Sequence, residues 1–296
     1  MIQKFLDHLL TEKRYSNNTI ISYSRDLKDF ELFLLKSEGI ENLCLVNKKM
    51  VRNFMMALSE KELSKRSINR KISSLRSYYS FLLKINEIAV SPIETIESLK
   101  FYPSKQIPMS EDEMVQLQEI LDENIDYLSK TIIETLYQTG IRRAELCNLL
   151  YQNVDLQNNE IKVIGKGNKT RLIPISDSLK KNFLDYLTIR QPNTNNKDWF
   201  FINKNGKKLT EKFVYLKVSS YLGLVTFKEK KSPHMLRHSF ATHVLNNGAE
   251  ISKVQKILGH ASLASTQVYT NANIEQLKKI YNKAHPRATG NNEKTD

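Results

Sequence analysis

Four short stretches of the sequence carry arginine, lysine, histidine and tyrosine side chains whose types and spacing could do chemistry. In the first, T-G-I-R-R-A-E-L at residues 139–146, Arg142 follows a glycine turn and begins a helix, with Glu145 one turn further on. A guanidinium can bind two phosphate oxygens at once. The same two residues also fit an ordinary ion pair on a helix surface, which contributes only roughly 0.2–0.5 kcal/mol. Arg142 therefore becomes a candidate only together with other residues.

The second stretch, I-G-K-G-N-K-T-R at residues 164–171, places Lys166 between two glycines. The β-prone runs at residues 160–163 and 171–174 predict a hairpin with a tight glycine turn between them. A lysine at the tip could reach a neighbouring groove, or it could simply be solvated. The stretch lacks the G-x-x-x-x-G-K-[ST] spacing of a nucleotide-binding loop.

The third stretch is S-P-H-M-L-R-H-S-F-A-T-H at residues 232–243. Ser232 as N-cap and Pro233 at the first helical position predict the start of a helix. His234 and Arg237 then lie three residues apart near that start and point the same way.

A metal site is the alternative for this histidine-rich helix. His234 and His238 are four residues apart on one face. His243 is five residues beyond His238 and turns to the far side of the helix. No carboxylate lies among the histidines, and Arg237 would stand beside the cation, so we predict no metal.

The fourth stretch is L-G-H-A-S-L-A-S-T-Q-V-Y-T at residues 258–270. A glycine turn after a helix presents His260, and Tyr269 follows nine residues later. A lone tyrosine at such a place is ordinarily a core or surface aromatic, so its meaning depends on the other three stretches.

The elements that must position these side chains are mainly helical. In the first hundred residues, apolar side chains recur at helical spacing. They include Leu27, Phe30, Leu34 and Leu35, and then Ile68, Ile72, Leu75, Tyr79 and Leu82. Residues 61–84 also carry basic side chains against one Glu, which fits either a solvated face or a helix that follows a phosphate backbone. The basic residues are Lys61, Lys65, Arg66, Arg70, Lys71, Arg76 and Lys84.

The stretch F-Y-P-S-K-Q-I-P at residues 101–108 favours extended structure and indicates a linker. We therefore expect a helical domain at 1–100, a linker at 101–109, a second domain at 110–288 and a flexible polar tail at 289–296. The second domain opens on a helix capped by Ser110, with Glu113 at its third position. The predicted fold class is mostly α, with two domains and one small β-hairpin or sheet in the second.

The chain carries 45 Lys and Arg against 32 Asp and Glu, a formal net charge of +13. Residues 1–108 hold 18 of these basic and 12 of these acidic residues, so both parts share the surplus. Such a surplus suits a polyanionic partner, although a charge that only keeps the protein in solution would look the same.

Two cysteines, Cys44 and Cys147, are too few for a disulfide framework. The N-terminus has no signal-peptide pattern, and no apolar run approaches the roughly 18 residues of a membrane span. We expect a cytoplasmic protein without membrane insertion.

In their order along the chain, the four stretches resemble the conserved motifs of the tyrosine recombinase and integrase family. The likeness extends from the helical first domain, which would be a SAM-like DNA clamp, to the H-P-R-A at residues 285–288, which is similar to the Xer subgroup. Asn271 departs slightly, since Xer proteins often have histidine there. The resemblance implies six active-site residues: Arg142, Lys166, His234, Arg237, His260 and Tyr269.

The chemistry of strand cleavage explains why these residue types are needed. Negative charge spreads over the non-bridging oxygens of a phosphodiester under attack, and Arg142 and Arg237 would neutralise it. The phenol of Tyr269 has an ordinary pKa of about 10, so the nucleophile needs a base, for which His234 is the candidate.

The leaving 5′-oxygen needs a proton, which Lys166 could donate, with Lys169 as the alternative donor. His260 would hydrogen-bond a phosphate oxygen, and Glu145 would hold Arg142 in place. A 3′-phosphotyrosine keeps the bond energy for rejoining, so we expect no cofactor.

By resemblance, the partner is double-stranded DNA with a specific recombination site, bound by a homo- or hetero-tetramer that could include a paralogous recombinase. Chromosome-dimer resolution with a septal DNA translocase is the role that the Xer likeness implies. A phage or mobile-element integrase, a type IB topoisomerase and a DNA-binding protein with decayed catalytic residues are the alternatives. The segment at residues 274–288 looks amphipathic, and we expect it to dock on a neighbouring protomer.

Overall fold

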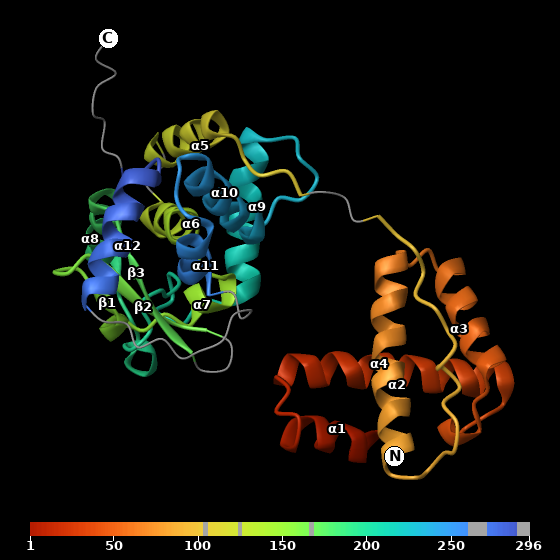
Figure 1. Cartoon of the computed structure of the whole chain (residues 1–296). Helices are drawn as coiled ribbons and strands as arrows, with labels where there is room; N and C mark the ends of the chain where they lie inside the picture. Colours follow the sequence, from red (N-terminus) through yellow and green to blue (C-terminus); the bar gives the residue numbers. More distant parts are fainter. Residues whose placement is uncertain (103–105, 124–125, 166–168, 260–270, 289–296) are drawn as a thin grey trace. The chain divides into compact units, whose positions relative to one another are not determined.

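The computed structural model in Figure 1 divides into two compact units, Met1–Ser104 and Lys105–Asp296. It describes residues 1–102, 106–123, 126–165, 169–259 and 271–288, without the side chains of 271–276. Each unit has its own hydrophobic core. The predicted fold class, mostly α with a small sheet in the second domain, is confirmed.

The N-terminal unit is a bundle of α-helices. Its helices are α1 (Ile2–Thr11), α2 (Asn17–Glu38), α3 (Lys48–Glu60) and α4 (Lys65–Lys84), with a short 3-10 helix at Leu43–Leu45. Serine hydroxyls cap two of them: Ser16 accepts from the backbone of Thr19, and Ser64 from that of Ser67. The predicted apolar faces of α2 and α4 form the core, except that Leu35 is exposed.

Arg70 and Lys71, two of the basic side chains in residues 61–84, are already bound to acidic side chains of the same unit. Asp26 of α2 is fully buried, and its carboxylate accepts hydrogen bonds from Arg70, Lys71 and Ser74 of α4. We expected Lys71 on a polar face, but it is buried. Its charge can be buried because the ammonium pairs with Asp26 and, at 2.5 Å, with Asp29. Arg70 and Lys71 therefore join α2 to α4 instead of both facing a phosphate backbone.

The C-terminal unit holds more helices around a small sheet. Its helices are α5 (Glu111–Glu123), α6 (Tyr127–Thr139), α7 (Arg143–Cys147), α8 (Asp177–Ile189), α9 (Glu211–Val225), α10 (Pro233–Asn246), α11 (Ile251–Leu258) and α12 (Asn271–Ala284), with 3-10 turns at Tyr151–Asn153 and Thr194–Asn196. The capping of α5 is as predicted: Ser110 Oγ accepts from the backbone N–H of Glu113, whose carboxylate accepts from that of Ser110.

The predicted hairpin is present and belongs to a three-stranded antiparallel sheet of order β1-β2-β3. Its strands are β1 (Val154–Asp155), β2 (Glu160–Ile164) and β3 (Thr170–Pro174). The β2–β3 register pairs Ile161 with Ile173 and Ile164 with Thr170. This register buries Ile161 and Ile173 in the core and turns Lys162 outward.

The centre of this unit is α6, whose side chains are almost all buried between α8 and α10. α6 ends at Gly140, whose φ of 60° lies in the left-handed region that favours glycine. The chain then turns directly into α7, so the turn before Arg142 is anchored on the core. None of the helices that the structure describes combines the length and the apolar character that a bilayer crossing requires.

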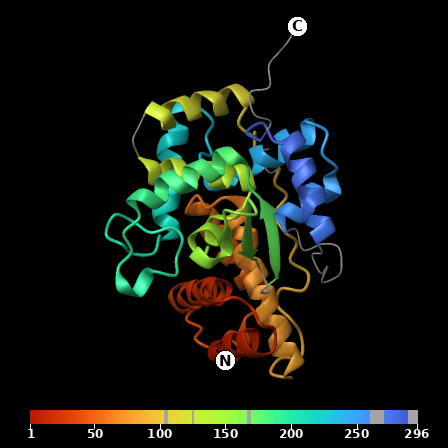
Figure 2. The same cartoon turned by 90° about the vertical axis from the view of Figure 1, so that its left-hand side faces the viewer.

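α12 packs on its own unit, beside β3, as Figures 1 and 2 both show. Leu277, Tyr281 and Ala284 of α12 are buried, and so is His285 behind it. Our expectation that residues 274–288 dock on a neighbouring protomer is therefore wrong for this structure, because the apolar face of α12 is already covered.

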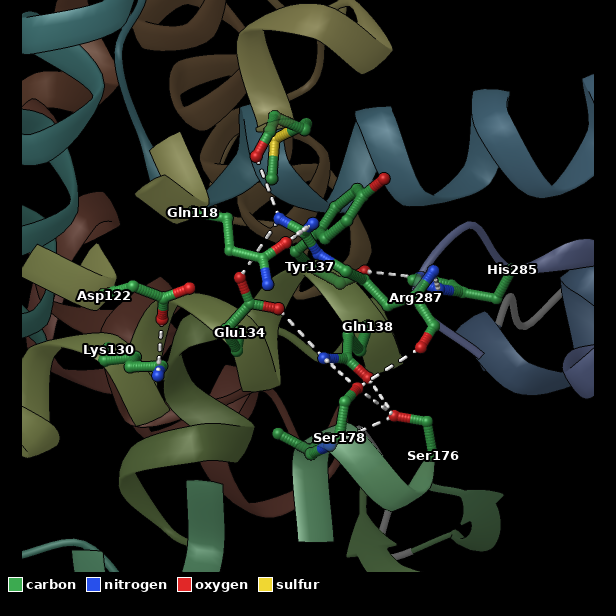
Figure 3. Close-up of polar contacts among 12 residues, drawn as sticks. Gln118, Asp122, Lys130, Glu134, Tyr137, Gln138, Ser176, Ser178, His285 and Arg287 are labelled. Carbon is green, nitrogen blue, oxygen red and sulfur yellow. Dashed lines mark hydrogen bonds and ion pairs between the residues drawn. The ribbon is translucent and has the colours of Figure 1, made fainter. Parts of the chain in front are cut away.

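The H-P-R-A segment at residues 285–288 closes this contact, as Figure 3 shows. The guanidinium of Arg287 donates to Gln118, to the backbone carbonyl of Met114 at 2.8 Å and to Glu134 at 3.4 Å. The ring of His285 stacks on Tyr281 with centroids 5.2 Å apart. Residues that we read only as a family likeness therefore anchor α12 on the rest of this unit.

Candidate active site

Arg142 stands at the start of α7 and is oriented by Glu145. Its backbone N–H donates to Glu145 Oε2 at 2.7 Å, and its guanidinium Nη1 donates to Oε1 at 2.9 Å. Nη2 donates to the carbonyl of Gly259 at 3.3 Å. The Glu145 side chain is only 6% exposed against 42% for Arg142, so this is not the surface ion pair that the sequence left open. The buried Glu145 carboxylate instead fixes the position of Arg142, whose guanidinium stays partly exposed.

Arg237 projects from α10 toward the same place and is buried. Its guanidinium donates to two backbone carbonyls, those of Gly140 and Leu258, the latter at 2.7 Å. Burial, and then the charge of Arg142, lower the pKa of Arg237 to about 10. The guanidinium therefore stays charged at neutral pH, beside Arg142.

His234, one helical turn before Arg237, is exposed to solvent. Partial desolvation, and then the charges of Arg237 and His238, lower its pKa below the ordinary value. The neutral imidazole is therefore favoured at neutral pH, and this is the form that can accept a proton.

These three side chains line one open groove of about 610 Å³ between α7, α9, α10 and the end of α11. Its lining includes Arg142, Arg143, Tyr215, His234, Arg237 and Leu258. The rim is fixed by an ion pair between Arg143 and Glu211 at 2.7 Å. Two guanidinium groups and a neutral imidazole in one groove could bind a phosphate diester and accept a proton from a nucleophile.

Three of the six predicted site residues lie outside the described residues: Lys166, His260 and Tyr269. Gly165 and Gly259, which precede two of them, are described, and both lie against Arg171. A Cβ on Gly165 would be 3.3 Å from Arg171 Nη1, and a Cβ on Gly259 would be 3.1 Å from it. The last described residue before each of these two stretches therefore lies next to the same side chain, that of Arg171.

Arg171 is the residue that the sequence reasoning missed. We quoted it as the end of a motif without a role, whereas its guanidinium is buried and forms a fork with Glu145 at 3.0 and 2.7 Å. A sequence signal existed, because an arginine within an apolar strand that faces the core needs a buried acidic partner. Burial alone would raise the pKa of Glu145, but hydrogen bonds from Arg171 and Arg142 outweigh it and hold that pKa below the ordinary value.

Within the described part of the chain, no three His, Cys, Asp or Glu side chains come together as a metal-binding cluster. His243, which the sequence placed on the far side of its helix, is buried there. Its Nδ1 lies 2.9 Å from the hydroxyl of Tyr137, and its Nε2 lies 2.8 Å from the carbonyl of Met109. Its ring joins α10 to the start of the unit.

Both parts of the chain match models of known protein families. A model of the phage integrase family matches residues 108–276, and one of the phage integrase N-terminal SAM-like domain matches residues 2–86. The tyrosine recombinase XerC of Listeria monocytogenes serotype 4a (strain HCC23) is 38% identical over 293 residues, 97% of each chain. The tyrosine recombinase XerD of Staphylococcus haemolyticus (strain JCSC1435) is 34% identical over 298 residues, 97% of this chain and 99% of that one.

Solved structures share the fold. The crystal structure of XerA recombinase is 26% identical, with a TM-score of 0.50 over 94% of this chain and 96% of that one. XerH site-specific recombinase bound to a palindromic difH substrate is 21% identical, with a TM-score of 0.69 over 98% of this chain and 83% of that one.

Proposed function

This chain belongs to the phage integrase family and is a site-specific tyrosine recombinase of Xer type, and from that premise we propose how its residues carry out the reaction. The enzyme breaks and rejoins DNA strands. We assign the nucleophile to Tyr269, the phosphate-binding cations to Arg142 and Arg237, and the base to His234.

One observation carries the assignment of the cations and the base: Arg142, Arg237 and His234 line a single groove although they come from two helices about ninety residues apart in sequence. The assignment of Tyr269 rests on the family motif. Two fixed guanidinium groups suit the non-bridging oxygens of the phosphate under attack, whose charge grows in the transition state. Loss of one such donor typically slows a reaction by about 10²–10³-fold.

Cleavage then proceeds by exchange of one phosphate ester for another. The Tyr269 oxygen forms a bond to phosphorus while the bond to the 5′-oxygen breaks, which leaves a 3′-phosphotyrosine. The phenol proton passes to His234, and the 5′-oxygen takes a proton from Lys166. His260 hydrogen-bonds a phosphate oxygen. Attack by the 5′-hydroxyl of another strand reverses these steps and rejoins the DNA.

We further propose that the substrate is duplex DNA with a specific recombination site, and that a homo- or hetero-tetramer assembles on it. The charge surplus in both parts of the chain supports binding by both units. We also propose a role in chromosome-dimer resolution, which the near full-length likeness to XerC and XerD supports. A septal DNA translocase is the further partner that we propose for this role.

The experiment that tests the proposal uses chromosomal fragments that the protein retains on a filter. The protein is incubated with these fragments, and covalent adducts are resolved on a denaturing gel. Tyr269→Phe should abolish the adduct but leave DNA affinity nearly unchanged, because only the nucleophilic oxygen is lost. Tyr102→Phe, on a tyrosine that is almost fully exposed, is the control and should form the adduct normally. Adducts from Tyr269→Phe would refute the assignment.

A further inference from the structure

Three consecutive backbone carbonyls at the end of α11 are each held by a different arginine. Ile257 O accepts from Arg171 Nε at 2.7 Å, Leu258 O from Arg237 Nη2 at 2.7 Å, and Gly259 O from Arg142 Nη2 at 3.3 Å. The last carbonyls of a helix lack partners within it and carry partial negative charge, which attracts cations. Arg142, Arg171 and Arg237 therefore all bind the C-terminal end of α11.

Arg171 differs from the other two arginines because it is not part of the groove lining and is 5% exposed. Its Nε binds Ile257, and both of its Nη atoms bind Glu145. It cannot reach a DNA phosphate without breaking these bonds, so any effect on the reaction must pass through its partners.

Glu145 is the partner that links Arg171 to Arg142. Oε1 accepts from Nη1 of both arginines, and Oε2 accepts from the backbone N–H of Arg142 and from Arg171 Nη2. All sides of this buried carboxylate are therefore occupied. With one side filled by Arg171, Arg142 meets Glu145 through a single guanidinium nitrogen.

A single contact leaves Arg142 available for substrate. A guanidinium has five N–H groups, and Arg142 uses one for Glu145 and one for Gly259. If Arg171 were absent, the open side of the carboxylate would attract Arg142 into a two-point fork, the geometry that guanidinium and carboxylate prefer. That rotation would withdraw Arg142 from the groove and from Gly259.

We propose that Arg171 is a positioning residue for strand cleavage: by occupying Glu145 and the carbonyl of Ile257, it keeps the guanidinium of Arg142 aimed into the groove. This inference rests on the proposed function, in which Arg142 neutralises the phosphate. Lysine cannot replace arginine here, because one ammonium cannot hold Ile257 O and both oxygens of Glu145 in a fork geometry.

The test compares Arg171→Lys with Arg190→Lys, a matched control in the same unit. Arg190 also holds backbone carbonyls, those of Lys197, Trp199 and Phe200, but lies outside the groove lining. Cleavage is measured in a single turnover at saturating protein, on a duplex nicked close to the phosphate at which the wild-type protein forms its covalent adduct. Arg171→Lys should be slowed about tenfold or more, as for outer-shell partners of metal ligands, with DNA affinity unchanged within about twofold. Arg190→Lys should cleave at the wild-type rate.

A second substrate separates positioning from general damage to the fold. In it, a neutral methylphosphonate replaces the phosphate that is cleaved, which reduces the need for Arg142. The defects of Arg171→Lys and of Arg142→Ala should both shrink on this substrate. Equal slowing of Arg171→Lys on the two substrates, or a wild-type rate on normal DNA, overturns the inference.

Two further variants keep the outcomes distinct. If Arg171→Lys does not fold, Glu145→Gln combined with Arg171→Met removes both buried charges, so this protein should fold. It should still cleave slowly, because Arg142 then has neither the Glu145 carboxylate that holds it nor the Arg171 guanidinium that fixes this carboxylate. A wild-type rate from the double variant also overturns the inference. Normal cleavage by Arg142→Ala refutes the proposed active site itself, whereas a defect in Arg142→Ala alone refutes only the role of Arg171.

Discussion

Gly140 joins α6 to the turn before Arg142, and replacing it with alanine should damage the groove from within the core. Its φ is +60°, and an added Cβ would lie 2.5 Å from Phe240 Cδ1 and 2.8 Å from Leu258 Cδ2. Both neighbours are buried and cannot move freely. The carbonyl of Gly140 also holds Arg237, so the overlap acts on two of the elements that carry the site.

Gly248, in the same unit, is the matched control. Its φ is +85°, and nothing lies within 4 Å of an added Cβ. Gly248→Ala therefore meets only the backbone strain of a left-handed conformation, roughly 1–2 kcal/mol. Gly140→Ala meets a similar strain and, in addition, about 1–3 kcal/mol of overpacking. The difference corresponds to a fall of roughly 2–12 °C in the unfolding temperature, at about 2–4 °C per kcal/mol for a unit of this size.

Scanning calorimetry of the whole chain measures this difference, with the transition of the larger unit followed in both variants. Gly140→Ala should unfold at the lower temperature and cleave DNA more slowly than Gly248→Ala. The reasoning is refuted if the two variants lose the same stability, because the contacts with Phe240 and Leu258 would then have no energetic effect.

Three further outcomes are expected. Lys166→Ala should cleave normal DNA slowly and recover on a substrate whose bridging 5′-oxygen is sulfur, since a thiolate leaves without a proton, while Arg142→Ala should stay slow on both; full activity of Lys166→Ala on normal DNA would point to another acid. DNA affinity should fall steeply with salt in a filter-binding assay, and residues 109–296 alone should bind more weakly than the whole chain; equal affinity would contradict a clamp made by both units. Burial lowers the pKa of His285 to about 3, from an ordinary pKa of about 6.5. Between about pH 6.5 and pH 3 the unfolded state therefore binds more protons than the folded state, and the protein loses stability as the pH falls through this window. His285→Asn should make the unfolding temperature less sensitive to pH in that window, and parallel curves for the two proteins would exclude this effect.

The sequence by itself determined the local features of the protein. The cap at Ser110, the turn at Gly140, the helix that starts at Pro233 and the hairpin at residues 160–174 all depend on neighbours within a few residues. Such features follow from backbone geometry and short-range hydrogen bonds, so a reader of the sequence can place them. The order of the four motifs also predicted the family, because it depends on residue types and spacing alone.

Only the tertiary structure decided which charged groups meet. Lys71 pairs with Asp26 across 45 residues, and Arg171 pairs with Glu145 across 26. The apolar strand around Arg171 indicates that this arginine is buried, but for neither basic residue does the sequence identify the acidic partner. The apolar face of α12 likewise predicts burial without saying against which surface. Partners so distant are chosen by the packing of helices and strands, where a buried charge must find its counter-ion and an apolar face must be covered. Local sequence patterns therefore do not predict which distant residues become partners.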